Sequence, residues 1–287
     1  MANTARDGAV RPNKNINKIK IVAAENFYGD IAKQLGGGRV AVKSIISNPN
    51  VDPHEYESSV EDSISIARAG VVIENGLGYD TWMDKLISAS PSPERTVITA
   101  GKIAPHLLPD NPHVWYGIDN IKAVAEAITE ALEKADPSGT PVYGKNLAGF
   151  INSLAPVRAK MDEIKSRYAG TPIGLTETIY LYQTRPMGLR VLTPFNFGKA
   201  VATGNDPAVS DVAIADGQIT GKKIKVLIYN SQTVTPVTTN MLNAARARGI
   251  PVVPVTETMP AGKHYQSWML GELNALEKGL AASGRQG

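Results

Sequence analysis

The chain contains no cysteine, and this absence excludes several kinds of site at once. None of its 287 residues can form a disulfide, a thiolate metal ligand or a cysteine nucleophile. Histidine is also scarce, because the whole chain has four. Any site that uses imidazole must therefore draw on a very small set of residues, while the lack of thiols fits an oxidising compartment as well as any other.

Excess charge and long apolar runs are missing too. The chain has 30 basic and 27 acidic residues, interspersed, so no basic tract is present to follow a phosphate backbone, and we expect no nucleic-acid partner. No apolar run approaches the roughly 18–20 residues that span a bilayer, so no membrane-spanning segment is expected. Residues 1–17 are polar, lack the apolar centre of an intact signal peptide, and are predicted to be disordered.

Short apolar runs alternate with helical patterns in both halves of the chain. Strands are expected at 19–24, 40–46, 71–73, 96–99, 172–175, 190–192, 224–229 and 251–255. Helices are expected at 30–35, 59–69, 118–135, 238–248 and 264–280. Because strands that alternate with helices form parallel sheets covered on both faces, the sequence predicts an α/β fold with two Rossmann-like lobes.

A helical pattern of unusual length separates the two halves. It runs over 142–168, and Pro156 is expected to kink it. We interpret it as a connector helix joining the lobes, whereas 195–217, rich in Gly, Asn, Asp and Pro, is expected to be an irregular surface segment. The predicted divisions are a disordered segment 1–17, an N-terminal α/β lobe 18–138, a connector helix 139–169 and a C-terminal α/β lobe 170–287.

Four segments each place one metal-ligand side chain beside turn residues. The four candidates are His54, His113, Glu177 and Glu257. Glu177 and Glu257 follow predicted strands, at the end of an open α/β sheet where such folds bind their ligands. His54 follows the strand at 40–46 across a Pro/Asn loop. Since two candidates come from each lobe, we predict a divalent metal site in the cleft between the lobes.

Other residues near these segments are weaker candidates. His106 has no carboxylate beside it and is interpreted as structural, while His264 has a possible role as an outer-shell partner or substitute ligand. Glu55 and Glu57 are expected either to accept a hydrogen bond from the ring of His54 or to be solvated. The phosphate-loop, nucleophile-elbow, zinc-protease and dinucleotide motifs are all missing, so no catalytic residue is predicted.

Taken together, five stretches resemble one family of transport proteins. They are AENFYGDI at 24–31, DPHEYE at 52–57, NGLGYDTW at 75–82, NPHVW at 111–115 and DP at 136–137. The chain is similar, from about residue 19 to 280, to the extracytoplasmic solute-binding proteins of manganese, zinc and iron ABC transporters. Their two lobes are joined by one long, rigid helix.

The resemblance implies a ligand set and a set of partners. The family's first two ligands fall on His54 and His113. Its third falls on Glu177, where zinc relatives commonly have histidine and manganese or iron relatives have glutamate; its fourth, usually aspartate, falls on Glu257. A histidine-rich loop, common in zinc relatives, is missing. The implied protein is a periplasmic or extracytoplasmic monomer that delivers metal to a membrane permease and is not an enzyme. Whether its full-length precursor is lipid-anchored stays open at this point.

The donor types then favour one metal over another. Two imidazoles and two carboxylates make a harder site than three imidazoles, and they neutralise a divalent ion, so Mn²⁺ is favoured, with Zn²⁺ or Fe²⁺ as alternatives. Two other functions stay open at this point. One is a metal-dependent hydrolase that uses the same His/Glu site with an open coordination position, and the other is a binder of a metal chelate or siderophore.

Overall fold

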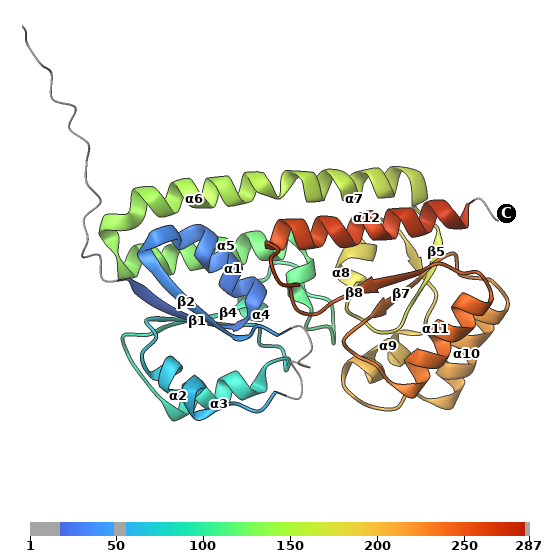
Figure 1. The fold of residues 1–287 in the computed structure, drawn as a ribbon, viewed down its shortest axis with the longest axis horizontal. Coiled ribbons are helices and arrows are strands. Elements are labelled where there is room, and N and C mark those ends of the chain that lie inside the picture. Colours follow the sequence, from blue (N-terminus) through green and yellow to red (C-terminus); the bar gives the residue numbers. More distant parts are fainter. Residues whose placement is uncertain (1–17, 49–55, 285–287) are drawn as a thin grey trace, which may run out of the picture.

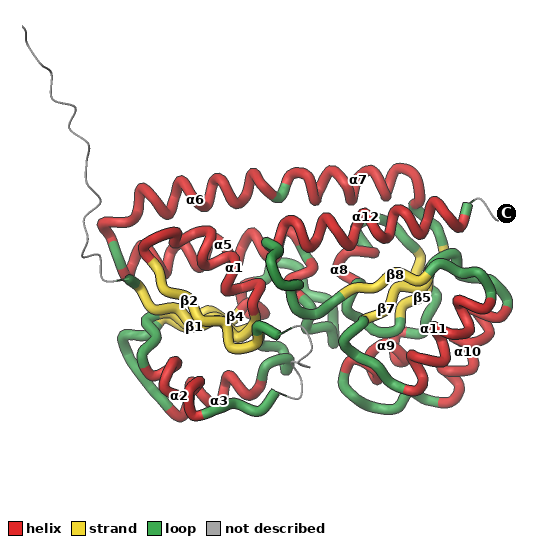
Figure 2. The backbone as a smooth tube through the Cα atoms, viewed as in Figure 1, coloured by secondary structure: helices red, strands yellow, loops and turns green. Residues whose placement is uncertain are grey.

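Two parallel sheets of four strands each form the body of the protein. A computed structural model of the chain describes residues 18–48 and 56–284. Helices cover both faces of each sheet, which confirms the predicted fold class of two parallel α/β lobes (Figures 1 and 2). The predicted segment 1–17 and the loop with His54 lie outside the described residues. The proposed lobe boundaries stay a prediction.

The first sheet has the strand order β2-β1-β3-β4. Its strands are β1 (Ile19–Glu25), β2 (Val40–Ile46), β3 (Val71–Glu74) and β4 (Thr96–Thr99). Alternate side chains of β1 enter different cores, because successive residues of a strand point to opposite faces. Ile21 packs with α1 (Asn26–Gly36) and α5 (Ile118–Ala135), whereas Val22 packs with α2 (Val60–Ala67) and α3 (Thr81–Ala89).

The second sheet has the order β6-β5-β7-β8. Its strands are β5 (Pro172–Leu175), β6 (Arg190–Val191), β7 (Leu227–Asn230) and β8 (Val252–Val255). One face packs against α9 (Phe195–Ala202), α10 (Val209–Thr220) and α11 (Pro236–Ala247), and the other against α12 (Tyr265–Ser283). Both sheets turn the carboxyl ends of their strands toward the middle of the molecule (Figure 1).

The long helical pattern forms two consecutive helices. They are α6 (Thr140–Ser153) and α7 (Ala155–Tyr168), which meet at Leu154, two residues before the proline expected to kink the pattern. Figure 1 shows them in line along one side of both sheets, with α12 beside α7. Lys160 and Arg167 of α7 both form ion pairs with Glu277 of α12, so the connector is fastened to the C-terminal helix.

The segment expected to be irregular is largely helical, and that prediction was wrong. Residues 195–217 fall mostly in α9 and α10. Glycine and asparagine suggested a loop, but Phe197 and Val201 on α9, and Ala215 and Ile219 on α10, are spaced four apart and buried together. Tertiary burial outweighs weak helix propensity here. The strand expected at 224–229 also begins later, at Leu227.

The described residues also form shorter elements: η1 (Gly37–Arg39), α4 (Ala100–Ile103), η3 (Val114–Tyr116), η4 (Pro137–Gly139) and α8 (Leu181–Thr184). None of the helices in the described part of the chain combines the length and the apolarity that crossing a bilayer requires.

Candidate metal centre

Three of the four predicted ligands converge at one point. His113, Glu177 and Glu257 each offer a ligand atom, and these atoms all lie within 4.8 Å of one another. All three side chains are buried, with at most 1% of the residue exposed. His113 comes from the first half of the chain and the two glutamates from the second. The fourth predicted ligand, His54, lies outside the described residues.

The order of strands in the second sheet explains how the two glutamates meet. Glu177 lies two residues after β5 and Glu257 two residues after β8, and β7 runs between those strands. Asn230 is the last residue of β7, and its amide therefore lies between the two carboxylates. Its Nδ2 donates to Oε1 of Glu177 at 2.9 Å and to Oε1 of Glu257 at 2.6 Å. Asn230 was not predicted; its signal was a polar residue ending an apolar strand.

Asn111 fixes the orientation of the His113 ring. Its Nδ2 donates to the carbonyl of Thr178 at 2.8 Å, which turns its Oδ1 toward the imidazole. That oxygen lies 2.8 Å from Nδ1 of His113 and accepts the proton carried there. Nε2 is then the nitrogen with the lone pair, which is the tautomer a metal-binding histidine needs. The proline-flanked histidine segment thus brings its own orienting residue.

A glycine-rich loop sends Tyr79 across to the other half of the molecule. Its phenol donates to Oε2 of Glu257 at 2.8 Å. The carboxylate of Asp80 shapes this loop by accepting the backbone N–H groups of Asn75 at 2.6 Å and Gly76 at 2.7 Å. Gly76 has a positive φ of 73°, which a glycine adopts without strain. Burial raises the pKa of Asp80 to about 7, although both amide donors act to lower it.

The segment after Glu257 is bonded to helix α1. Asn26 forms a pair of hydrogen bonds with the backbone of Met259, at 2.7 and 2.9 Å. One turn later, Asp30 accepts the backbone N–H of Tyr265 at 2.9 Å and lies 2.7 Å from Nδ1 of His264. His264 is thus engaged at the surface with α1, whereas the three clustered residues are buried. These contacts anchor the Glu257 loop on the first half of the protein.

The remaining weak candidates lie apart from the cluster. His106 is exposed, and its backbone pairs with the side chain of Asn120, in keeping with a structural role. Glu57 is exposed, and Glu55 lies outside the described residues. A buried carboxyl that was not predicted as a site residue, Glu25, ends β1. Burial, and after it the charge of Asp80, raise the pKa of Glu25 well above its ordinary value.

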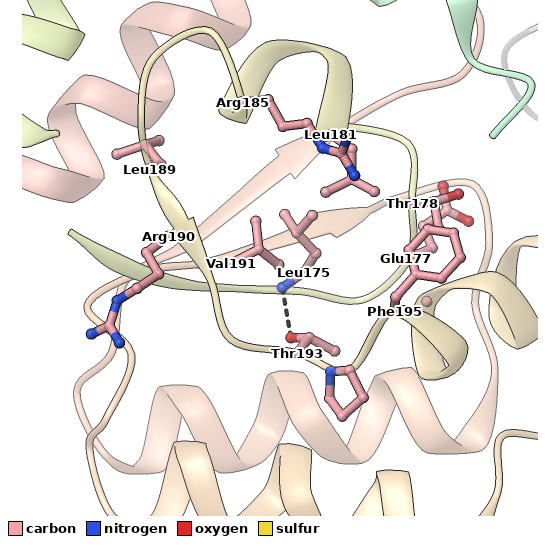
Figure 3. Close-up of a pocket in the computed structure, with 12 residues that line it drawn as sticks. Leu175, Glu177, Thr178, Leu181, Arg185, Leu189, Arg190, Val191, Thr193 and Phe195 are labelled. Carbon is pink, nitrogen blue, oxygen red and sulfur yellow. Dashed lines mark hydrogen bonds between the residues drawn. The ribbon is translucent and has the colours of Figure 1, made fainter. Parts of the chain in front are cut away.

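An apolar cavity of about 450 Å³ lies behind Glu177. Figure 3 shows Glu177 and Thr178 at one end of it, beside the ring of Phe195, with Leu181 reaching in from α8. Helix α9 closes this end through Gly198, where an added Cβ would lie 3.1 Å from the carbonyl carbon of Glu177. The glycine therefore lets the helix support the backbone of a cluster residue directly.

A comparison with family models identifies the group to which this architecture belongs. The model described as the zinc-uptake complex component A, periplasmic (ZnuA), matches residues 21–279. The chain belongs to this family. The match spans both sheets, the connector helices and all three clustered residues, so the resemblance noted from the five sequence stretches is confirmed.

Individual relatives support the same assignment. The chain is 26% identical over 173 residues to the iron-binding protein YfeA of Yersinia pestis, a match that covers 58% of this chain and 55% of that one. It is 29% identical over 169 residues to the manganese ABC transporter substrate-binding lipoprotein PsaA of Streptococcus anginosus, covering 54% and 53%. These alignments thus span about half the length of the curated relatives.

The similarity in three dimensions extends further. The periplasmic zinc-binding protein TroA of Treponema pallidum superposes with a TM-score of 0.77, covering 92% of this chain and 99% of that one. Because the two sequences are only 21% identical, this superposition shows that the fold is shared and says nothing about the bound metal.

Proposed function

We propose that this protein is an extracytoplasmic substrate-binding protein that captures a divalent transition metal ion between its two lobes. The observation that supports this most directly is the convergence of His113, Glu177 and Glu257, which are buried and drawn from both halves of the chain. Buried carboxylates that lie this close repel one another unless a cation or hydrogen-bond donors offset their charge. We propose His54 as the fourth ligand.

The donor set bears on the identity of the metal. With His54 included, two nitrogens and the oxygens of two carboxylates would surround the ion, and two negative charges would neutralise it. Oxygen-rich sites suit Mn²⁺ and Fe²⁺, although Zn²⁺ binds almost any such site more tightly than Mn²⁺ does. We propose Mn²⁺ as the preferred cargo, with Zn²⁺ and Fe²⁺ as the alternatives that a competition experiment decides between.

Capture and delivery, without catalysis, is the role that fits the donor set. All four proposed ligands would be committed to the ion, whereas a hydrolytic metal site keeps a position for water and places a base beside it. We propose that the loaded protein docks as a monomer on the membrane permease of an ABC transporter, and that it works in the periplasm or outside the cytoplasmic membrane. The names of the family and of the lipoprotein relatives support this placement.

Elemental analysis followed by competitive titration with Mn²⁺ and Zn²⁺ tests the proposal. We expect one equivalent of tightly held metal in the wild type, and its loss in His113→Ala and in Glu177→Ala. The control is His106→Ala, which removes an exposed imidazole and should leave the affinity unchanged. A wild-type protein that takes up no stoichiometric metal on reloading would overturn the proposed function, and so would full binding by both cluster variants.

A further inference from the structure

A single carboxyl on helix α12 touches the two segments that carry His113 and Glu257. Oε1 of Glu272 accepts the backbone N–H of Thr256 at 3.0 Å and the indole N–H of Trp268 at 2.9 Å. Its Oε2 lies 2.9 Å from the phenol oxygen of Tyr116. Thr256 directly precedes Glu257. Tyr116 lies three residues after His113, to whose carbonyl its own backbone N–H donates at 3.2 Å.

Glu272, Tyr116 and Thr256 form a junction, in which the phenol of Tyr116 also contacts Thr256 directly. Its oxygen lies 2.8 Å from the backbone carbonyl oxygen of Thr256. Thr256 is therefore hydrogen-bonded through its N–H to Glu272 and through its C=O to Tyr116. All of these groups lie at the boundary between the two halves of the chain, and Tyr116 and Glu272 are both buried. A shift of either segment would therefore break hydrogen bonds in a place that water does not reach.

Counting protons in this junction shows where one must be. A phenol has one hydrogen, yet Tyr116 lies within bonding distance of two acceptors, the Thr256 carbonyl and Oε2 of Glu272. An ionised Glu272 would compete with the carbonyl for that hydrogen and leave one buried acceptor without a donor. A proton on Oε2 removes the conflict, because Glu272 then donates to Tyr116 and Tyr116 donates to Thr256.

We propose that Glu272 is a positioning residue of the metal site, which carries a proton on Oε2 and, through Tyr116 and Thr256, sets the position of Glu257 relative to His113. This inference rests on the proposed function, since it concerns the same two ligands. Glu272 lies outside the set of clustered residues, so its effect on metal affinity is indirect.

The surroundings of Glu272 agree with a protonated carboxyl. Burial raises its pKa to about 8, although its polar contacts with Tyr116, Thr256 and Trp268 act to lower it. The titratable groups that face it are three buried phenols, Tyr116 from η3, Tyr180 from the segment before α8 and Tyr265 from α12 itself, and burial raises the pKa of each. On the α7 side of α12, Lys160 and Arg167 pair with Glu277.

The proposal predicts a distinctive dependence on pH. As the pH rises through about 8, the carboxyl loses its proton, the carboxylate takes the Tyr116 hydrogen, and the Thr256 carbonyl loses its donor. Metal affinity of the wild type should therefore fall between pH 7.5 and 9 more steeply than that of Glu272→Gln. The glutamine amide keeps a donor toward Tyr116 and an acceptor toward Thr256 at every pH.

The experiment measures Mn²⁺ and Zn²⁺ affinities of the wild type and four variants at pH 6.5, 7.5 and 9. At pH 7.5, Glu272→Ala and Tyr116→Phe should bind both metals more weakly by roughly 10- to 100-fold, the usual cost of losing an outer-shell partner. Glu272→Gln should stay near the wild type. The matched control is Glu277→Gln, the same change on the same helix, which removes ion pairs to α7 and should leave the affinity and its pH profile unchanged.

Two outcomes would overturn the inference while leaving the proposed function intact. One is unchanged metal affinity in Tyr116→Phe. This variant keeps the aromatic packing, so it can be measured even if Glu272→Ala fails to fold. The other is a loss in Glu272→Gln as large as that in Glu272→Ala, because it would show that a charged carboxylate is required. A wild-type protein without metal affinity would instead remove the proposed function, so the two failures are distinguishable.

Discussion

The amide of Asn230 offers a sharp test of how the candidate site is organised. Its Nδ2 donates to one oxygen of Glu177 at 2.9 Å and to one oxygen of Glu257 at 2.6 Å, so one side chain orients both carboxylates. Asn230→Ala removes both donors. Each hydrogen bond to a charged group contributes about 1.5–3 kcal/mol, so the two carboxylates should turn away from each other and lose their shared orientation.

The expected cost is a 10- to 100-fold weaker affinity for Mn²⁺, as for other partners that orient metal ligands. This range corresponds to about 1.4–2.7 kcal/mol of binding free energy. At saturating metal, the stabilisation conferred by the ion should shrink by the same amount. For a chain of this size, the metal-induced rise in melting temperature should then be smaller by about 3–10 °C.

Calorimetric titration with Mn²⁺ and thermal unfolding with and without metal measure both quantities. The control is Asn205→Ala, since Asn205 is exposed and its amide bonds only to nearby Thr203 among the described residues. If Asn230→Ala binds Mn²⁺ as tightly as the wild type, the carboxylates do not depend on the amide for their orientation, and the reasoning is refuted.

Three further predictions follow from other parts of the structure. Gly198→Ala should weaken metal binding in a titration, because the new Cβ would lie 3.1 Å from the backbone carbonyl carbon of Glu177. Its control is Gly217→Ala, on an open helix surface, which should raise the free energy of unfolding by about 0.5–1 kcal/mol in thermal unfolding and leave metal binding unchanged. Hydrogen bonds, the strongest from Ser138, lower the pKa of Asp136 to about 2. The ionised carboxylate therefore stabilises the fold above about pH 4, and this contribution is lost as the pH falls toward 2. In Asp136→Asn, the free energy of unfolding should lose less between pH 4 and pH 2 than it does in the wild type. The backbone N–H of Met259 should exchange slowly with or without metal, since Asn26 holds it from α1, and fast exchange in the metal-free protein would contradict this anchoring.

Strand and helix periodicity was enough to predict the fold, because the central strands β1, β3, β5 and β7 are largely buried and are bounded by glycine, proline or polar turns. The failures have specific physical causes. Helices α9 and α10 depend on a shared core at Phe197, Ala215 and Ile219, and the one apolar pair spaced four apart in each helix is too short a pattern to show this against the glycine, asparagine and proline around it. Strand β7 begins late because its first residue, Leu227, pairs with Val252, the first residue of the neighbouring strand β8.

The predicted site residues were found from their chemistry, and their partners were not. His113, Glu177 and Glu257 are metal-ligand types that stand at turns, so their positions could be read from the sequence. Asn230 and Glu272 become functional candidates only once strand order and helix packing place them against the clustered residues or the segments that carry them. A polar residue at the end of an apolar strand and a glutamate within an amphipathic helix look ordinary until their neighbours are known.

The way Glu257 is held bears on how such a protein can release what it binds. Its carboxylate is bonded to Asn230 of its own half and to Tyr79 of the other half, so it spans the boundary. The backbone on either side of it is also fixed to other elements, through Asn26 after it and through Glu272 before it. Pulling the halves apart as rigid bodies would break the bonds from Tyr79, Asn26 and Tyr116 together, at a buried boundary where each costs most. Because Glu257 and the residue before it are also bonded within their own half, this segment is held more firmly than either motion alone would require, and we expect opening to come from local rearrangement of another segment rather than from a wide hinge motion about the connector helices.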